Sequence, residues 1–213
     1  MKDTFRQQGK RQLLVETIKE KGIQDEAVLN AIGAIPRHLF MDSSFEDHAY
    51  QDKAFPIAAD QTISQPFTVA FQTELLQVKK GEKILEVGTG SGYQAAVLCE
   101  LGAKVYTIER QQELYKKTKR FLDDLGYRIK HGTFGDGYKG MPAYAPFDKI
   151  VVTAGAPYVP KALMAQLKVG GRMVIPVGKE NQTMTLFIRK SEKEFEKKKF
   201  GAFRFVPLLK DKN

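Results

Sequence analysis

Residues 83–110 carry the pattern that most constrains how this chain can fold. A short apolar run ends in the turn Gly88-Thr89-Gly90-Ser91-Gly92, a segment of helical character follows, and a second apolar run stops at Glu109. This order is typical of a βαβ unit that binds an adenosine-bearing cofactor, in which the glycines let the backbone approach the ligand and an acid about 20 residues further on binds the ribose hydroxyls. We therefore expect Gly88, Gly90, Gly92 and Glu109 to bind such a cofactor.

The spacing of the glycines indicates which cofactor it is. Dinucleotide sites usually have G-x-G-x-x-G with a pyrophosphate on the helix N-terminus, whereas this turn is G-x-G-x-G, and Glu86 lies two residues before its first glycine. An acid beside the turn would repel a pyrophosphate but could bind a cation. S-adenosylmethionine carries a sulfonium and an ammonium and no phosphate, so the pattern favours it over NAD, with Glu86 as a further cofactor-binding residue.

Length and composition bound the class of protein. The chain has 213 residues, enough for one domain with a full core, and its 42% hydrophobic and 28% charged residues describe a soluble globular protein. It has no apolar stretch of membrane-spanning length and no secretory apolar region at its N-terminus. The single cysteine, Cys99, suits a reducing compartment and is expected to be a small buried residue. We expect a cytoplasmic protein, a monomer without a membrane partner.

The formal net charge of +9 is concentrated at the two ends of the chain. Residues 1–21 have a net charge of +3 and residues 189–213 a net charge of +5, which leaves +1 for the 167 residues between them. A nucleic-acid channel leading to the cofactor would need basic and aromatic residues nearer the glycine turn. We therefore expect solvated basic ends and no nucleic-acid partner.

Helical patterns precede the glycine turn. We expect one helix around residues 11–20 and a second that Asp25 caps and Pro36 stops. Residues 36–66 show no clean periodicity; a loop of this length usually carries function, and its aromatic residues suggest a packed layer. A third helix is expected at residues 67–77.

After Gly81, strand and helix patterns alternate. Strands are expected at 83–88, 104–109, 129–134, 149–154 and 172–177, and helices at 92–101, 111–125 and 160–168. Residues 183–190 predict a half-exposed strand, residues 194–200 a polar turn, and residues 201–209 the last strand.

The predicted fold class is α/β: a Rossmann-like, mostly parallel sheet with helices on both faces, an antiparallel C-terminal edge and an N-terminal helical cap. We expect one domain with three parts. Residues 1–80 form the cap and the substrate-side segment, residues 81–180 the cofactor-binding core, and residues 181–213 the C-terminal strands.

The carboxyl ends of the strands offer few groups for catalysis. Asp136, in a Gly-Asp-Gly turn after the third predicted strand, could bind the adenine amino group or merely form an Asx-turn. No nucleophile elbow or phosphate loop occurs, and the three histidines have no metal-ligand spacing, so we expect no metal. Methyl transfer from a sulfonium needs mainly alignment, and a carboxylate acceptor needs no base because it is already ionised at neutral pH.

Several motifs then point to a known family. They are IPRHLF (35–40), TISQP (62–66), LEVGTGSGY (85–93), FGDGYKG (134–140), APFDKIVVTAGAP (145–157), LKVGGRMVIPVG (167–178) and RFVPL (204–208). In this order, over nearly the whole chain, they resemble the protein-L-isoaspartate O-methyltransferase family. The resemblance implies an S-adenosylmethionine methyltransferase fold and a repair enzyme that methylates the α-carboxylate of L-isoaspartyl residues, releases S-adenosylhomocysteine and leaves an ester that closes to a succinimide.

The resemblance also implies roles for residues. Ser64 would be the active-site residue, which we interpret as hydrogen bonding to the acceptor carboxylate, since a serine without a base partner is a poor nucleophile. Thr62 and Ile63 would shape the same wall, and Val206 and Pro207 would lie near the substrate backbone. Among the residues that carry over as cofactor contacts are Gly88, Glu109, Asp136 and Gly137. Where some members have a hydroxyl residue after VPL, this chain has Leu209, so that cofactor contact is not expected.

Two alternatives remain open at the level of sequence. The basic ends allow a methyltransferase acting on nucleic acid or on a small metabolite. The cofactor pattern alone also allows a binding module that senses S-adenosylmethionine without transferring its methyl group.

Overall fold

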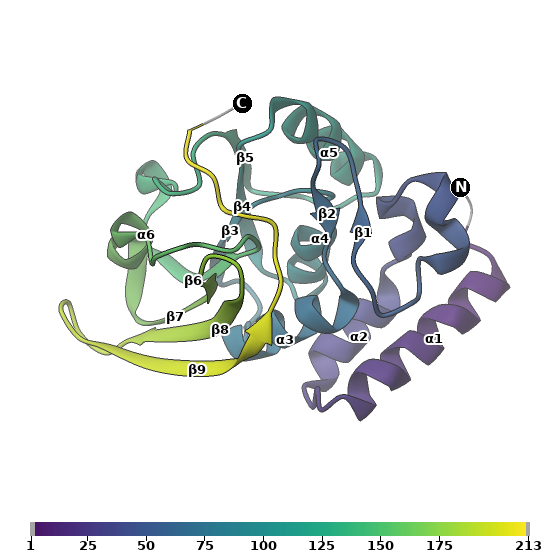
Figure 1. Cartoon of the computed structure of the whole chain (residues 1–213), viewed down its shortest axis with the longest axis horizontal. Helices are drawn as coiled ribbons and strands as arrows, with labels where there is room; N and C mark the ends of the chain where they lie inside the picture. Colours follow the sequence, from purple (N-terminus) through teal and green to yellow (C-terminus); the bar gives the residue numbers. More distant parts are fainter. Residues whose placement is uncertain (1–2, 212–213) are drawn as a thin grey trace.

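A seven-stranded sheet forms the centre of the molecule (Figure 1). The structure, a computed structural model, describes residues 3–211; Lys2 and Lys212, which belong to the basic ends, lie outside the described residues. The strand order is β5-β4-β3-β6-β7-β8-β9. The strands are β3 (Lys83–Val87), β4 (Lys104–Glu109), β5 (His131–Phe134), β6 (Phe147–Val152), β7 (Leu167–Val177), β8 (Gln182–Arg189) and β9 (Phe195–Phe203).

The direction of the strands agrees with the predicted fold class. Strands β3 to β7 pair in parallel, whereas β7–β8 and β8–β9 pair antiparallel, because no helix intervenes to return the chain. Buried side chains alternate between the two faces of β3, so that Ile84 and Leu85 belong to separate apolar cores. The Rossmann-like α/β prediction with an antiparallel C-terminal edge is confirmed.

Helices cover both faces of the sheet. Helices α3 (Pro66–Leu76), α4 (Tyr93–Glu100) and α5 (Gln112–Asp124) contribute to the core that contains Ile84. Helix α6 (Lys161–Gln166) and the 3₁₀ helix η3 (Pro142–Tyr144) contribute to the core that contains Leu85. Within residues 3–211, no helix combines the length and apolar character that a bilayer crossing requires.

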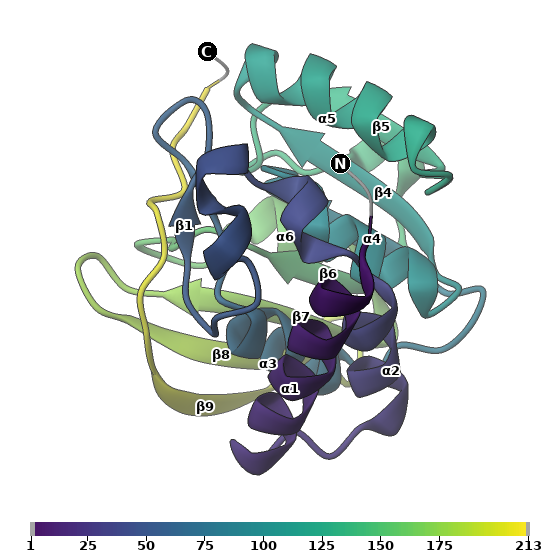
Figure 2. The ribbon, with the colours of Figure 1, turned by 90° about the vertical axis from the view of Figure 1, so that its right-hand side faces the viewer.

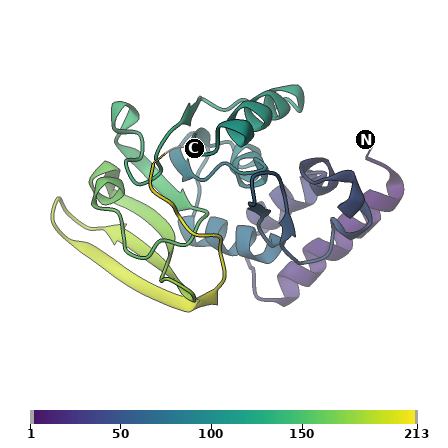
Figure 3. The ribbon, with the colours of Figure 1, turned by 45° about the horizontal axis from the view of Figure 1, so that its top comes forward.

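Two N-terminal helices form an outer layer over α3 and α4. They are α1 (Phe5–Glu20) and α2 (Glu26–Ala34), and the Asp25 side chain caps α2 by accepting from the backbone N–H groups of Ala27 and Val28, as predicted. Figure 3 shows the pair on the side of the molecule away from β8 and β9, and in Figure 2 the same pair faces the viewer.

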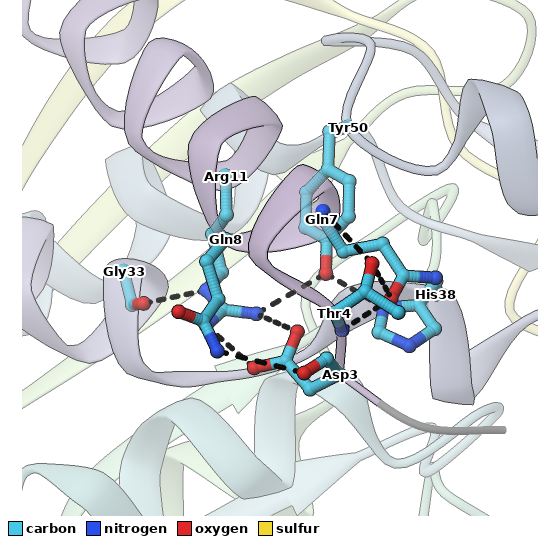
Figure 4. A network of polar contacts seen from close by, with 8 residues as sticks. All are labelled: Asp3, Thr4, Gln7, Gln8, Arg11, Gly33, His38 and Tyr50. Atoms are coloured by element: carbon cyan, nitrogen blue, oxygen red, sulfur yellow. Dashed lines mark hydrogen bonds and ion pairs between the residues drawn. The ribbon is translucent and has the colours of Figure 1, made fainter.

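A buried polar network holds α1 in place (Figure 4). The Arg11 guanidinium donates to both carboxylate oxygens of Asp3 at 3.0 Å, to the Gly33 carbonyl at 2.7 Å and to the Tyr50 hydroxyl at 3.2 Å. The Tyr50 hydroxyl lies 2.7 Å from Nδ1 of His38, and burial lowers the pKa of His38, so the neutral ring can accept this hydrogen bond. The network joins α1 to the end of α2 and to the long segment that follows.

The long segment without periodicity folds into short elements. They are the 3₁₀ helices η1 (Arg37–Phe40) and η2 (Ser43–His48) and a small antiparallel pair, β1 (Phe55–Pro56) and β2 (Thr62–Ile63). Its aromatic residues pack as predicted, with ring centroids 5.5 Å apart for Phe40 and Tyr93 and likewise 5.5 Å for Phe45 and Phe55. This packing places the β1–β2 pair next to the glycine turn, where the Ile57 side chain approaches Gly90.

The C-terminal prediction is partly wrong. Residues 194–200 are not a turn: they lie mostly in β9, which pairs with the whole of β8, from Gln182 opposite Phe203 to Arg189 opposite Phe195. An edge strand can stay lysine-rich because backbone pairing holds it: Lys197, Lys198 and Lys199 are exposed, while Phe200 and Phe203 pack against Phe71. Of the predicted last strand, only residues 201–203 belong to β9; residues 204–209 form one isolated bridge, between Pro207 and Gly155. In Figures 1 and 2 this segment passes beside the β1–β2 pair.

Candidate active site

A cavity opens at the carboxyl ends of β3, β4 and β6, where the fold predicts a ligand. Five segments form most of its wall: the glycine turn, the end of β4, the residues after β6, β2 with its neighbours Gln61 and Ser64, and the C-terminal segment 206–209. Among the residues predicted for the site, the cavity is lined by Thr62, Ile63, Ser64, Gly88, Gly90, Glu109, Gly137, Val206 and Pro207. The structure thus brings residues 61–64 and 206–209 to the same cavity as the glycine turn.

Gly88 is held tightly against the loop after β6. Its φ is +99°, and a Cβ there would lie 2.5 Å from Oγ1 of Thr153. The same hydroxyl donates to the carbonyls of Val87 at 3.0 Å and Gly88 at 2.6 Å, which fixes the start of the turn. Only glycine satisfies both the dihedral angle and the close approach.

Glu109 braces the turn from the neighbouring strand. Its carboxylate accepts from the backbone N–H of Gly90 at 2.8 Å and of Gln111 at 2.9 Å, and it is 5% exposed at the cavity wall. Each carboxylate oxygen keeps acceptor capacity after these bonds. The side chain can therefore hold the turn and still accept from ligand hydroxyls, as a ribose-binding acid must.

Three predicted cofactor residues do not line the cavity. Gly92 instead begins α4, with φ +85° and with Thr118 and Leu122 of α5 packed where a Cβ would be. The Asp136 carboxylate accepts from the Tyr138 N–H at 2.8 Å and so forms the Asx-turn that was the alternative interpretation of this residue. Its side chain is half-buried and is not among the residues that line the cavity. The third residue is Glu86.

The prediction that Glu86 binds a cationic ligand directly needs correction. Its side chain is fully buried behind the turn, where the Thr107 hydroxyl donates to Oε2 at 2.6 Å, and Thr107 in turn lies 2.6 Å from the hydroxyl of Thr89. Burial raises the pKa of Glu86 to about 8, so the carboxyl is neutral at pH 7. Glu86 can therefore reach the cavity only through Thr107 and Thr89, which lines it.

This burial predicts a pH dependence of folding. The pKa of Glu86 is higher in the folded chain than the ordinary value of 4.5. Protonation of Glu86 therefore stabilises the folded chain fully below pH 4.5, and this stabilisation is lost as the pH rises to about 8. Between these values the free energy of unfolding should fall by about 1.4 kcal/mol per pH unit from this group. The variant Glu86→Gln keeps an acceptor for Thr107 and should remove that slope in urea titrations at several pH values. An unchanged slope would show that Glu86 is ionised in the folded state.

Sequence reasoning missed several residues of the cavity wall, namely Gln61, Val69, Tyr93 and Gln94. Tyr93 and Gln94 open helix α4, and their polar groups before the apolar run AAVL were the available signal. Gln94 donates to Oγ1 of Thr73 at 3.0 Å, while its buried Oε1 has no hydrogen-bond partner among the described residues. This oxygen is a further acceptor next to the cavity.

The histidines and the cysteine, which are the remaining candidates for metal or thiol chemistry, pack against other side chains. Within residues 3–211, no group of three or more histidine, cysteine, aspartate or glutamate residues could hold a metal ion. His131 lies against the Tyr144 ring, and His48 lies 2.8 Å from the Gln51 amide. Burial raises the pKa of Cys99 to about 12, which keeps the thiol protonated and unreactive.

Comparison with known proteins identifies the family. The sequence model of one family, protein-L-isoaspartate(D-aspartate) O-methyltransferase, matches residues 8–213. The chain belongs to this family. The resemblance predicted from the sequence motifs is thereby confirmed.

Members of this family align with the chain over most or all of its length. A protein-L-isoaspartate O-methyltransferase of Christiangramia forsetii is 79% identical over 213 residues, which cover 100% of both chains. A solved protein-L-isoaspartate O-methyltransferase has a TM-score of 0.84 at 30% identity and covers 92% of this chain and 65% of its own, longer chain. A Plasmodium falciparum structure assigned to the same enzyme has a TM-score of 0.82 at 23% identity, covers 94% of this chain and 99% of its own, and supports the fold alone.

Proposed function

We propose that this chain transfers a methyl group from S-adenosylmethionine to the α-carboxylate of L-isoaspartyl residues in damaged proteins, with the two reactants meeting in the cavity described above. Membership of the isoaspartate O-methyltransferase family assigns the reaction and the methyl donor. The observation that carries the proposed arrangement is the composition of the cavity wall, in which a cofactor-type glycine turn faces the hydroxyl-bearing segment Thr62–Ser64.

The donor side of the cavity suits S-adenosylmethionine. Two glycines of the wall are closely packed: a Cβ on Gly137, in the turn after β5, would lie 2.6 Å from Cγ1 of Val87, and one on Gly88 would lie 2.5 Å from Oγ1 of Thr153, so neither position has room for a side chain. Glu109 and Gln94 offer acceptors for ligand hydroxyl or ammonium groups. Among the lining residues the only basic side chain is Arg110, which agrees with a ligand that carries no phosphate. When bound, S-adenosylmethionine supplies a methyl group that its sulfonium already activates.

The acceptor side would be formed by Thr62, Ile63 and Ser64 together with Val206 and Pro207. Within the described part of the chain, no hydrogen bond occupies the Ser64 hydroxyl, and no base is positioned to remove its proton. Ser64 is therefore free to donate to an incoming carboxylate but is not activated as a nucleophile. Val206 is held in place because its carbonyl accepts from the Gly155 N–H at 2.8 Å. In this arrangement the residues orient the carboxylate, and the reaction needs no proton transfer.

The variant Ser64→Ala should lower kcat/KM for an isoaspartyl peptide about 10- to 100-fold, the cost of one hydrogen bond to a charged group. The KM for S-adenosylmethionine should change less than about twofold, because the serine acts on the acceptor side. Initial rates with each reactant varied in turn separate the two effects. Ser191→Ala, in the turn before β9, is the matched control and should have no effect. A normal kcat/KM in Ser64→Ala would remove this residue from the mechanism.

An experiment with protein substrates distinguishes a methyltransferase from a module that only senses the cofactor. Incubated with labelled S-adenosylmethionine and an aged protein mixture, the enzyme should produce methyl groups that mild base releases as methanol, because they are esters. Tight cofactor binding without any transfer would favour the sensing module.

We further propose that the enzyme works as a cytoplasmic monomer, without nucleic-acid or membrane partners. The single cysteine and the confinement of basic charge to the chain ends support this proposal. Sedimentation at several concentrations tests the monomer. Binding of RNA or DNA with a steep salt dependence would contradict the absence of a nucleic-acid partner.

A further inference from the structure

A groove continues from the acceptor side of the cavity to the protein surface. We call it the acceptor groove and define it by Lys21, Thr62, Ser64, Phe67, Arg204 and Val206. Thr62, Ser64 and Val206 line both the groove and the cavity, so the two spaces are continuous. A chain whose isoaspartyl residue reached Ser64 would lie along this groove with the neighbouring residues.

The two basic residues of the acceptor groove differ in their surroundings. Lys21 is neutralised by Asp52, at 2.5 Å, whose carboxylate also accepts from the Gln65 amide at 2.9 Å and from the Phe67 N–H at 2.7 Å. Arg204 is exposed, and within residues 3–211 it has no ion-pair partner. None of the lining residues is acidic. The uncompensated charge of the acceptor groove is therefore the guanidinium of Arg204.

The backbone on both sides of Arg204 is fixed. The Phe203 ring stacks on Phe71, with centroids 5.3 Å apart, and the Phe205 N–H donates to the Gln182 side chain at 2.9 Å. These contacts hold residue 204 on the wall of the groove although it lies outside the regular part of β9. An arginine positioned in this way can bind a carboxylate through two parallel hydrogen bonds.

We propose that the acceptor groove binds the residues next to the isoaspartyl residue and that Arg204 selects substrates with a carboxylate side chain there. The inference rests on the proposed function, which it deepens by naming a preference among isoaspartyl substrates. Deamidated and isomerised segments rich in aspartate or glutamate are then methylated faster than neutral or basic ones. Because the pair forms at an exposed site, the preference is modest and weakens with salt.

The test starts from a peptide in which one isoaspartyl residue has two glutamines on each side. Each of these four glutamines is replaced in turn, once by glutamate and once by lysine. At low ionic strength the wild-type enzyme should show a kcat/KM about threefold higher for glutamate than for glutamine in at least one position. Arg204→Gln should abolish this preference, and Arg204→Glu should reverse it in favour of lysine. Arg128→Gln is the matched control, since Arg128 is an exposed arginine outside the cavity and the groove.

The outcomes separate the inference from the function on which it rests. Equal kcat/KM for glutamate and glutamine at every position, or an equal loss of preference in Arg204→Gln and Arg128→Gln, would overturn the role of Arg204 while leaving the methyltransferase intact. If no peptide of the series were methylated, the proposed function would fall together with the specificity.

Discussion

Replacement of Glu109 by alanine should weaken binding of S-adenosylmethionine about 100-fold. The carboxylate holds the Gly90 and Gln111 N–H groups at 2.8 and 2.9 Å, and the proposed function adds ligand hydroxyls to the same oxygens. Hydrogen bonds to a charged acceptor contribute about 1.5–3 kcal/mol each, and 1.4 kcal/mol corresponds to a tenfold change in affinity. Calorimetric titration with S-adenosylhomocysteine measures the loss without turnover.

Two further variants make the Glu109 prediction specific. Glu109→Gln retains one acceptor oxygen, so its affinity should lie between those of the wild type and Glu109→Ala. Glu113→Ala removes the same charge from an exposed position in the first turn of α5 and should bind the ligand normally. If Glu109→Ala retained wild-type affinity, the carboxylate would not contact the cofactor, and the donor side of the cavity would need another assignment.

Replacement of Arg37 by methionine should lower the free energy of unfolding by about 3 kcal/mol. Arg37 is fully buried, donates to the carbonyls of Ala49 at 3.0 Å and Lys53 at 3.2 Å, and lies over the Tyr93 ring, 4.9 Å from its centroid. Burial lowers the pKa of Arg37 to about 10, which still leaves it charged at pH 7. Methionine fills much of the volume but leaves the buried Ala49 carbonyl and the part-buried Lys53 carbonyl without this donor, and a buried carbonyl without a donor costs about 1–3 kcal/mol.

Urea unfolding of the wild type and the Arg37 variants measures this loss. Arg37→Lys should recover only part of the stability, because an ammonium cannot reproduce the planar fork that serves two separate carbonyls. Arg6→Met, at an exposed site of α1, is the control and should stay within about 0.5 kcal/mol of the wild type. Wild-type stability of Arg37→Met would mean that the Ala49 and Lys53 carbonyls find other donors. Because Tyr93 lines the cavity, a loss of cofactor affinity should accompany the loss of stability.

Local sequence patterns predicted those strands well whose formation depends on residues within the strand and the turn beside it. Strands β3 and β4 and the glycine turn after β3 follow from apolar runs, the spacing of the glycines and an acid at the end of the second strand, all of which are short-range signals. The pattern failed at β9, where an edge strand rich in lysine looks like a turn until β8 is there to pair with it.

The site was harder to predict because its wall is assembled over long distances in the sequence. Gln61 lines the cavity although it lies far from the glycine turn in the sequence, in a segment that packs against Tyr93 through Arg37 and Phe40. Glu86 shows the opposite error: its position next to the turn suggested an ionised ligand contact, but alternation along β3 directs it into the interior. The sequence spacing placed Glu86 near the glycine turn. Its burial in the structure determines where its side chain points and that its carboxyl is neutral.

Methylation of a matched pair of peptides decides whether the enzyme acts on isoaspartyl residues. The two peptides have the same composition and differ only in whether one residue is L-isoaspartate or L-aspartate; each is incubated with the enzyme and S-adenosylmethionine carrying a labelled methyl group. We expect a base-labile methyl ester on the isoaspartyl peptide and at most background label on the aspartyl peptide. Equal labelling of both peptides, or label on neither, would contradict this expectation.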